Sequence, residues 1–401
     1  MKKPKGPVAI IIGSGVVSLG VINDLACDGI RVIHISPKHD DLALRSRWPQ
    51  EKFVLDPADD QTEPLIGLLR SNSTRFGGAC LIPTTDPMLR IVSKNLSQIG
   101  QEYVSPVMPW HQLRGIVNKG LLYETAVKTG IPTPKIRYGD DLADTGAWQD
   151  SLMFPVIVKP SETPKFFAQF GVKVLQANDV SQLQRHLAAV NRLELEVMVS
   201  EIIPGNQTDL KCYRCYIDQR GKVIAEMCSE KLRSHPPEFG VGIVQRTIPM
   251  HPTLREQGLD LLHNLNFTGF ATVEFKYDSR DDQYKLMEIN PRPAMVQRLF
   301  RRAGINFAKL TVDDLMGKPL EETYSYSPGV YAIHNSADLY HLRRHLKMGA
   351  HGLREYLTPY FARRKVLLVP PILDPVPFLY DVSKIIGSRL TRLLGRSATL
   401  A

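Results

Sequence analysis

The sequence predicts an α/β domain at the N-terminus, then a region of α+β character, and finally a basic C-terminal extension. Three observations support this order. Residues 8–12 form a continuous apolar run that leads into a Gly-Ser-Gly turn, which is typical of a strand buried on both faces of a parallel sheet. Strand-like and helix-like segments alternate from there to about residue 115, as in a doubly wound fold. Hairpin patterns replace this alternation after residue 118.

The other elements of the N-terminal domain, residues 1–115, follow from the same alternation. A helix should run from the glycine turn to about Asp28, and a second helix should begin at Asp86 with a proline in its first turn. The strands predicted between these helices are Arg31–Ile35 and Ala79–Ile82. Such a domain places the carboxyl ends of its parallel strands along one edge of the sheet.

The turn Gly13-Ser14-Gly15 admits two interpretations. Its backbone N–H groups could hold a phosphate at the N-terminus of the following helix. However, the third glycine of a dinucleotide fingerprint is absent, and His34 and Ser36 stand where an acidic residue would be expected. We therefore interpret the segment as a tight turn and keep a nucleotide site as the alternative.

Residues 116–318 form the second predicted domain. The stretch after Asn118 is helical as far as Gly130, where glycine and the following prolines end the helix. Its other helices are predicted at 179–190 and 252–266, and its other strands at 155–159, 195–203, 209–217 and 222–232.

The final hairpin of this domain is the most informative segment. Its strands are Phe270–Asp278 and Tyr284–Asn290, and a five-residue loop between them would place Glu274 directly opposite Glu288 on one face. Two carboxylates in direct cross-strand opposition repel each other, which favours a cation between them. Carboxylate and amide oxygens suit Mg²⁺. The alternative is a register shifted by one residue, which would turn each glutamate towards solvent.

The composition excludes several classes of protein. A chain of 401 residues with 43% hydrophobic and 23% charged residues is globular and can bury sizeable cores. Five cysteines are too few for a disulfide framework in a chain of this length. Cys212 and Cys215 lie three residues apart in a strand-like segment, so their thiols should point to opposite faces. We interpret both as buried structural thiols, since a zinc site would need a second pair.

The positive charge is concentrated in the C-terminal extension, residues 319–401. The whole chain carries +9, and residues 341–401 alone hold 11 Lys or Arg against three acids, a balance of +8. One interpretation is an interfacial segment that lies on anionic lipid. The interpretation that we prefer is an extension packed on the domain with solvated arginines. Nucleic-acid binding is not expected, because one short basic segment lacks a recognition fold.

We expect a cytoplasmic protein, with possible contact at the inner face of a membrane through the extension. The N-terminal stretch has a basic start and an apolar run, but no small-residue cleavage site follows it. No run reaches the 18 or more apolar residues of a membrane span.

The segment LMEINPRP (286–293), with Glu274 in TVEFKYD, resembles the metal-binding end of ATP-grasp enzymes. Other landmarks of that superfamily occur in the same order: NKGLLYETAVKTGIPTP (118–134), PVIVKP (155–160) and SEIIPG (200–205). The resemblance covers about residues 80–318 and is specific as a set. EKLRSHPPEFGVG (230–242) and the hairpin are most similar to the D-aspartate ligase-like carboxylate–amine ligases. The implied fold is a pre-ATP-grasp α/β domain (1–115) followed by a two-lobed ATP-grasp domain (116–318), with lobes at about 116–195 and 196–318.

The resemblance implies which residues bind ATP. Lys159 resembles the lysine that contacts the α- and β-phosphates, and Lys119 resembles an earlier nucleotide contact. Glu201 lies in the segment that passes the adenine between the lobes, and Asp209 resembles the acid that takes the ribose hydroxyls.

The resemblance also implies a metal and a catalytic residue. Glu274, Glu288 and Asn290 resemble the ligands of Mg²⁺, with Mn²⁺ as an alternative ion. Arg292 would meet the transferring phosphoryl group or the substrate carboxylate with its bidentate fork. On the substrate side the assigned residues are Lys231 and Arg233, for which ordinary surface charge is the alternative.

One feature departs from many ATP-grasp proteins. They carry a glycine-rich phosphate loop after the strand of Lys159, whereas residues 160–173 contain only Gly171. The D-aspartate ligase-like group also tends to lack those glycines. The segment is therefore expected to close over ATP with its side chains.

The function that the resemblance implies is an ATP-dependent carboxylate–amine ligase that forms an acyl phosphate and releases ADP and phosphate. Its partners would be a small-molecule carboxylate and an amine. The alternatives are an ATP-grasp carboxylase and a non-catalytic ATP-binding module associated with a membrane. The sequence does not name either substrate or the oligomeric state.

Overall fold

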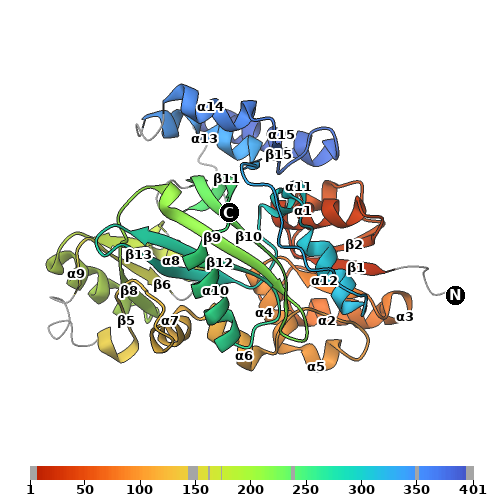
Figure 1. Cartoon of the computed structure of the whole chain (residues 1–401), viewed down its shortest axis with the longest axis horizontal. Helices are drawn as coiled ribbons and strands as arrows, with labels where there is room; N and C mark the ends of the chain where they lie inside the picture. The colour runs from red at the N-terminus through yellow and green to blue at the C-terminus, as the bar shows by residue number, and fades with distance from the viewer. Residues whose placement is uncertain are drawn as a thin grey trace.

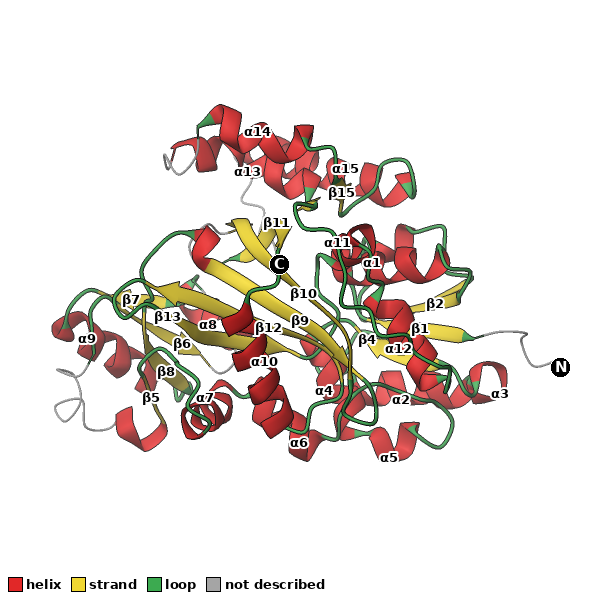
Figure 2. Cartoon of the chain, in the orientation of Figure 1, coloured by secondary structure: helices red, strands yellow, loops and turns green. Residues whose placement is uncertain are grey.

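The computed structural model describes residues 7–142, 152–160, 163–172, 174–235, 240–347 and 352–393. Three sheets make up its framework. In the view of Figure 1 a large central sheet lies between the N-terminal domain on one side and a smaller lobe on the other, and the last helices cover one end. Figure 2 shows the helices packed outside these sheets.

The N-terminal domain is the predicted doubly wound fold. Its sheet has the order β3-β2-β1-β4 and every pair is parallel. The strands are β1 (Val8–Ile12), β2 (Arg31–Ser36), β3 (Glu51–Val54) and β4 (Cys80–Pro83). The helices are α1 (Gly15–Ala26), α2 (Thr62–Ser71), α3 (Ser73–Phe76), α4 (Asp86–Lys94), α5 (Leu96–Ile99) and α6 (Trp110–Val117). All five residues of β1 are buried, as its apolar run requires.

The small lobe is an antiparallel sheet with the order β5-β8-β6-β7. Its strands are β5 (Ile136–Tyr138), β6 (Val156–Pro160), β7 (Leu175–Ala177) and β8 (Val197–Glu201), and its helices are α7 (Lys119–Lys128), α8 (Thr163–Phe170) and α9 (Val180–Asn191). Helix α8 lies where the sequence predicted a loop that closes over ATP. The two ends of that loop, residues 161–162 and 173, lie outside the described residues.

The central sheet has seven strands in the order β13-β12-β9-β10-β11-β14-β15. They are β9 (Leu210–Ile217), β10 (Val223–His235), β11 (Val241–Ile248), β12 (Gly269–Asp278), β13 (Gln283–Asn290), β14 (Tyr331–Ile333) and β15 (Lys365–Leu367). The helices that follow these strands are α10 (Pro252–Asn264), α11 (Gln297–Ala303) and α12 (Phe307–Leu315). The sequence analysis did not predict β11, which completes the broad middle of the sheet.

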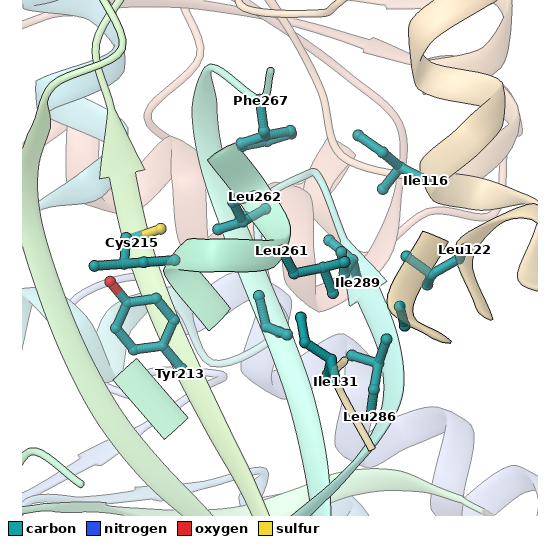
Figure 3. Packing of buried hydrophobic residues seen from close by; sticks show 14 of the residues in the cluster. Ile116, Leu122, Ile131, Tyr213, Cys215, Leu261, Leu262, Phe267, Leu286 and Ile289 are labelled. Atoms are coloured by element: carbon teal, nitrogen blue, oxygen red, sulfur yellow. The ribbon is translucent and has the colours of Figure 1, made fainter. Parts of the chain in front are cut away.

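Different cores cover the two faces of the central sheet. On one face, side chains of β9, β12 and β13 pack against α6, α7 and α10 (Figure 3). On the other face, α11 and α12 cover only one end, with Phe300 and Phe307 in the apolar cluster there. The rest of this second face carries polar side chains, and it holds the candidate site.

The two cysteines of the C-x-x-C pair lie on opposite faces of β9, as predicted. Cys215 belongs to the core of Figure 3, while Cys212 faces the candidate site and pairs in register with Glu274. Both thiols are buried and free. Burial raises the pKa of each thiol.

The described part of the C-terminal extension is packed on the rest of the chain, which was the preferred interpretation. Strands β14 and β15 continue the central sheet. Helices α13 (Asn335–Lys347) and α14 (Leu353–Phe361) lie between these strands in the chain, and α15 (Pro375–Leu393) follows β15. The buried carboxylate of Asp374 accepts hydrogen bonds from Ser46 Oγ at 2.5 Å and from the Arg47 N–H at 3.2 Å. These contacts tie the extension to the N-terminal domain.

Candidate active site

The β12–β13 hairpin places Glu274 opposite Glu288 and Thr272 opposite Asn290, as the sequence predicted. The predicted loop is wrong by one residue, because Asp278 pairs with Gln283 and leaves a four-residue loop. A β-bulge corrects the difference: Phe275 pairs with Leu286, so Met287 is the extra residue on β13. The Met287 carbonyl accepts a hydrogen bond from Tyr123 Oη at 2.8 Å, which ties α7 to the bulge.

Lysines from two other elements hold the opposed carboxylates. Lys231 Nζ on β10 donates to Glu274 Oε2 at 2.5 Å. Lys119 Nζ, in the first turn of α7, lies 3.4 Å from Glu288 Oε2. Burial alone would raise the pKa of Glu288, but Lys119, Lys231 and the hydrogen bond from Asn290 lower it to about 2. Burial alone would lower the pKa of Lys231, but its ion pair with Glu274 raises it. Both groups are therefore charged at neutral pH.

The donor set fits a hard divalent cation. Glu274 and Glu288 present carboxylate oxygens from adjacent strands, and Asn290 Nδ2 donates to Glu288 Oε1 at 3.0 Å. That hydrogen bond fixes the Asn290 amide and leaves its Oδ1 as an acceptor. Mg²⁺ commonly takes one or two carboxylates and completes its shell with water and phosphate oxygens. The two carboxylates and the amide could therefore supply the protein ligands of a Mg²⁺ ion.

Lys159 brings a third ammonium group to the site from the small lobe. It lies at the end of β6. Burial and the neighbouring Lys119 lower the pKa of Lys159 to about 7, while Glu288 opposes this shift. Among the residues that the structure describes, no carboxylate lies within ion-pairing distance of its Nζ. A bound anion would stabilise the protonated form of Lys159, because it would offset both the burial of this ammonium group and the charge of Lys119.

The predicted adenine and ribose residues lie where the two lobes join. Glu201 ends β8 and is buried, and its Oε1 accepts the Met153 N–H at 2.9 Å. Its Oε2 lies 3.5 Å from Arg280 Nη2 in the loop of the β12–β13 hairpin. Asp209 Oδ2 accepts the Asn206 N–H at 2.6 Å. Both carboxylates therefore hold the connection between the lobes.

Arg292 follows the hairpin and reaches the N-terminal domain. Its Nε and Nη2 donate to the two carboxylate oxygens of Asp86 at 2.5 and 2.8 Å. Burial alone would lower the pKa of Arg292, but its ion pair with Asp86 and the charges of Glu288 and Glu274 raise it. Asp86 is largely exposed. The guanidinium of Arg292, the predicted catalytic residue, therefore binds an exposed aspartate. A substrate anion could compete with Asp86 for this guanidinium.

The structure corrects the prediction for Arg233, which was assigned to the substrate side. Its side chain is buried, and Nε and Nη2 donate to the two carboxylate oxygens of Asp338, both at 2.8 Å. The guanidinium also lies 4.0 Å from the centre of the Tyr356 ring. Arg233 therefore anchors the C-terminal extension to β10. Regular pleating would place Lys231 and Arg233 on the same face of β10, but the register shift between them interrupts that alternation.

The structure also shows why the glycine turn of the N-terminal domain is a tight turn. Asp41 Oδ1 accepts the Gly15 N–H at 2.7 Å, so a carboxylate already occupies the N-terminus of α1. Asp41 Oδ2 lies 3.0 Å from Nε2 of the buried His34. The position where an acidic residue was expected thus holds a histidine that orients this carboxylate.

Sequence reasoning missed two polar residues near the site, Asp86 and Arg214, and it assigned no role to Thr272 beyond its place opposite Asn290. Arg214 and Thr272 are buried on the polar face of the sheet and pair in register with each other. The signal was present in β9, because an arginine two residues after Cys212 must point to the same face.

Three comparisons place this geometry among known proteins. The chain is 25% identical over 253 residues to the D-aspartate ligase of Enterococcus faecium, which covers 61% of this chain and 60% of that protein. The L-amino acid ligase of Bacillus licheniformis superposes with a TM-score of 0.60 at 18% identity, over 79% of this chain and 76% of that one. N5-carboxyaminoimidazole synthetase of Staphylococcus aureus gives a TM-score of 0.61 at 16% identity, over 82% of each chain.

These comparisons confirm the ATP-grasp fold and the resemblance to D-aspartate ligase. The chain spans about three fifths of the length of that ligase. No protein-family model matches the chain.

Proposed function

We propose that the chain is an ATP-dependent carboxylate–amine ligase that works through an acyl phosphate and uses Mg²⁺. The observation that carries this proposal is the opposed Glu274–Glu288 pair, ionised between lysines of two elements at the junction of the two lobes. An ATP-grasp carboxylase would use ATP in the same way. The two activities are distinguished by the substrate that ATP consumption requires, an acid and an amine for the ligase and bicarbonate for the carboxylase.

Each site residue has a proposed role. Lys159 and Lys119 hold the phosphates of ATP, and the segment from Glu201 to Asp209 holds its adenine and ribose. Bound Mg²⁺, on Glu274, Glu288 and Asn290, would neutralise charge on the terminal phosphates. Arg292 would exchange Asp86 for the phosphoryl group or the substrate carboxylate, since its fork suits either anion.

The reaction needs no covalent nucleophile from the protein. An oxygen of the substrate carboxylate attacks the γ-phosphorus and ADP leaves. The amine then attacks the acyl carbon, and inorganic phosphate leaves with the oxygen that joined carbon to phosphorus. The chain contributes positioning and charge neutralisation, which are the main terms in phosphoryl transfer.

An isotope experiment tests this route. With both oxygens of the acid labelled with ¹⁸O, we expect one label in each released phosphate and ADP production that requires both acid and amine. Mass spectrometry of the phosphate, on a panel of amino acids and small acids, measures this. Label found in AMP instead of in phosphate would contradict the proposal, because it indicates an adenylate. Label passed from bicarbonate instead would indicate a carboxylase, and ATP binding without turnover would indicate a sensor.

We further propose that α14 and the residues after it contact an anionic membrane surface. Leu353 and Phe361 are 56% and 81% exposed, and with Leu357 they lie at i, i+4 and i+8 on one side of α14. Arg363, Arg364 and Lys365 follow directly and are exposed. Leu357, Phe361 and Arg354 also line an open hollow.

Charge complementarity supports an anionic lipid as the partner. Residues 341–401 carry 11 Lys or Arg against three acids, a net charge of +8. One of these acids, Asp374, is buried and accepts a hydrogen bond from Ser46. Apolar side chains beside such charge are typical of interfacial helices. Among the described residues, no helix has the length and apolar character needed to cross a bilayer.

Vesicle binding tests the membrane proposal. The full chain should bind phosphatidylglycerol vesicles and not phosphatidylcholine vesicles, and the binding should fall as salt rises. Changing Arg363, Arg364 and Lys365 to Gln should weaken binding by about 100-fold, at about 1 kcal/mol for each basic residue. Val127→Ser, which removes a 65% exposed side chain on α7, is the matched control and should bind normally. Equal binding by the triple variant would contradict the proposal, as would a concentration-dependent dimer through this face with no vesicle binding.

A further inference from the structure

Helix α7 packs on the central sheet, although the chain leads from it into the small lobe. Leu122, Tyr123 and Ala126 are buried in the core that this sheet shares with α6 and α10 (Figure 3). The small lobe has a separate core, and the residues described for that core begin at Leu142. The hydrophobic contacts of α7 therefore fix it to the sheet that carries the opposed glutamates.

Two side chains of α7 reach consecutive residues of β13. Lys119 and Tyr123 are four positions apart, so they lie on the same side of the helix. Lys119 Nζ lies 3.4 Å from Glu288 Oε2, and Tyr123 Oη donates to the Met287 carbonyl at 2.8 Å. The helix thus contacts both a proposed metal ligand and the residue that precedes it.

The Tyr123 hydroxyl is the hydrogen-bond partner of the bulge. Met287 is the extra residue on β13, and the residues on either side of it pair with β12. Bulges beside active sites commonly redirect a neighbouring side chain, and their carbonyls need a partner outside the regular ladder. Tyr123 is 1% exposed, and burial raises the pKa of its phenol. The hydroxyl therefore keeps its proton and remains a donor at neutral pH.

We propose that Tyr123 is a positioning residue for the metal site. Through the Met287 carbonyl it sets the direction of Glu288 and keeps this carboxylate beside Lys119. The inference rests on the Mg²⁺ site of the proposed function. Groups behind metal ligands commonly control metal affinity, because they orient the ligands before the ion binds. Loss of the Tyr123 hydroxyl should therefore weaken metal binding while the fold is retained.

The chain contains a matched tyrosine for the test. Tyr103 is also buried, and its Oη donates to the Leu69 carbonyl at 2.7 Å in the core of the N-terminal domain. Tyr103→Phe and Tyr123→Phe remove the same atom, and each leaves a carbonyl without its donor. Both variants should therefore lower the melting temperature by a similar few degrees. Only Tyr123→Phe should change metal binding.

The effect of Mg²⁺ on ADP binding measures the metal site without turnover. Isothermal titration gives the dissociation constant of ADP in EDTA and in excess Mg²⁺, and the ratio of the two is the contribution of the ion. We expect Mg²⁺ to tighten ADP binding by the wild type, and we expect this ratio to fall about 10-fold in Tyr123→Phe. The constant measured in EDTA should change little. Tyr103→Phe should keep the ratio of the wild type.

The other outcomes contradict the inference in distinguishable ways. A wild-type ratio in Tyr123→Phe would mean that this hydroxyl only stabilises the fold. An equal fall of the ratio in Tyr103→Phe would indicate general loosening of the protein rather than positioning. If Mg²⁺ does not tighten ADP binding by the wild type, the metal site is wrongly assigned and the role of Tyr123 fails with it. The isotope test of the ligase reaction is a separate measurement, so failure of the positioning role alone leaves the proposed function intact.

Discussion

Turnover of the Glu288→Gln variant is expected to be about 1,000-fold below that of the wild type, with a melting temperature within about 2 °C. Metal ligation contributes several kcal/mol to the stabilisation of transferring charge, and about 4 kcal/mol corresponds to this factor. The fold should tolerate the change because glutamine keeps the shape of the side chain and removes one of two opposed carboxylates. ADP release in the presence of both substrates measures the first effect, and thermal unfolding measures the second.

Glu226→Gln is the matched control for this variant. Glu226 is also a buried glutamate of the central sheet, but it accepts hydrogen bonds from Tyr213 and Arg255 on the opposite face. This substitution should lower the melting temperature and leave turnover per folded molecule unchanged. If Glu288→Gln instead unfolds at a much lower temperature while it retains turnover, Glu288 is structural and the metal site is wrongly assigned.

The Lys159→Met variant should bind MgATP about 10- to 100-fold more weakly than the wild type. A hydrogen bond to a charged group contributes about 1.5–3 kcal/mol, and Lys159 has no carboxylate partner among the described residues that would compete for it. Isothermal titration with MgATP measures the change. Lys128→Met, which alters an exposed lysine in the last turn of α7, should leave the affinity unchanged. Unchanged affinity in Lys159→Met would move the phosphate site elsewhere.

The pH dependence of the same binding gives an independent check. The pKa of Lys159 in the free protein is about 7, so the group is protonated below that pH and neutral above it. A bound phosphate favours the protonated form and raises this pKa. The affinity should therefore be constant below pH 7 and fall as the pH rises above it, with proton uptake on binding. Titrations in buffers of different ionisation enthalpy detect this uptake, which should be absent in Lys159→Met.

Sequence patterns predicted the opposed glutamates because both lie in one hairpin, whose strands are close together in the chain. The hairpin loop and strand alternation sufficed to oppose Glu274 and Glu288, and this pairing is confirmed. The predicted loop was one residue too long, and the agreement at the glutamates depends on the bulge at Met287. A bulge has no strong sequence signal, because it depends on what packs against the strand. Here Tyr123, more than 160 residues away, binds the extra carbonyl.

Arg233 and Arg214 show the limit of the same reasoning. Both are arginines on strands of the central sheet, and nothing in their neighbouring residues distinguishes them. Asp338, from the C-terminal extension, neutralises Arg233 and removes it from the substrate side. Arg214 has only neutral partners. The roles of charged side chains depend on partners that the chain brings from distant positions.

The sequence by itself determined the doubly wound N-terminal domain and the opposition of Glu274 and Glu288, because periodic burial and hairpin pairing act between residues close in the chain. The ATP-grasp fold and the nucleotide-binding residues were implied by the resemblance of the sequence motifs to that superfamily. Only the tertiary structure decided which charges are compensated: Lys231 with Glu274, Arg292 with Asp86, and Lys159 and Arg214 without a carboxylate among the described residues. The physical reason is that a buried charge is compensated only when an opposite charge lies within a few ångströms. The partners come from segments far apart in the chain, and the sequence alone does not show which of these segments are in contact.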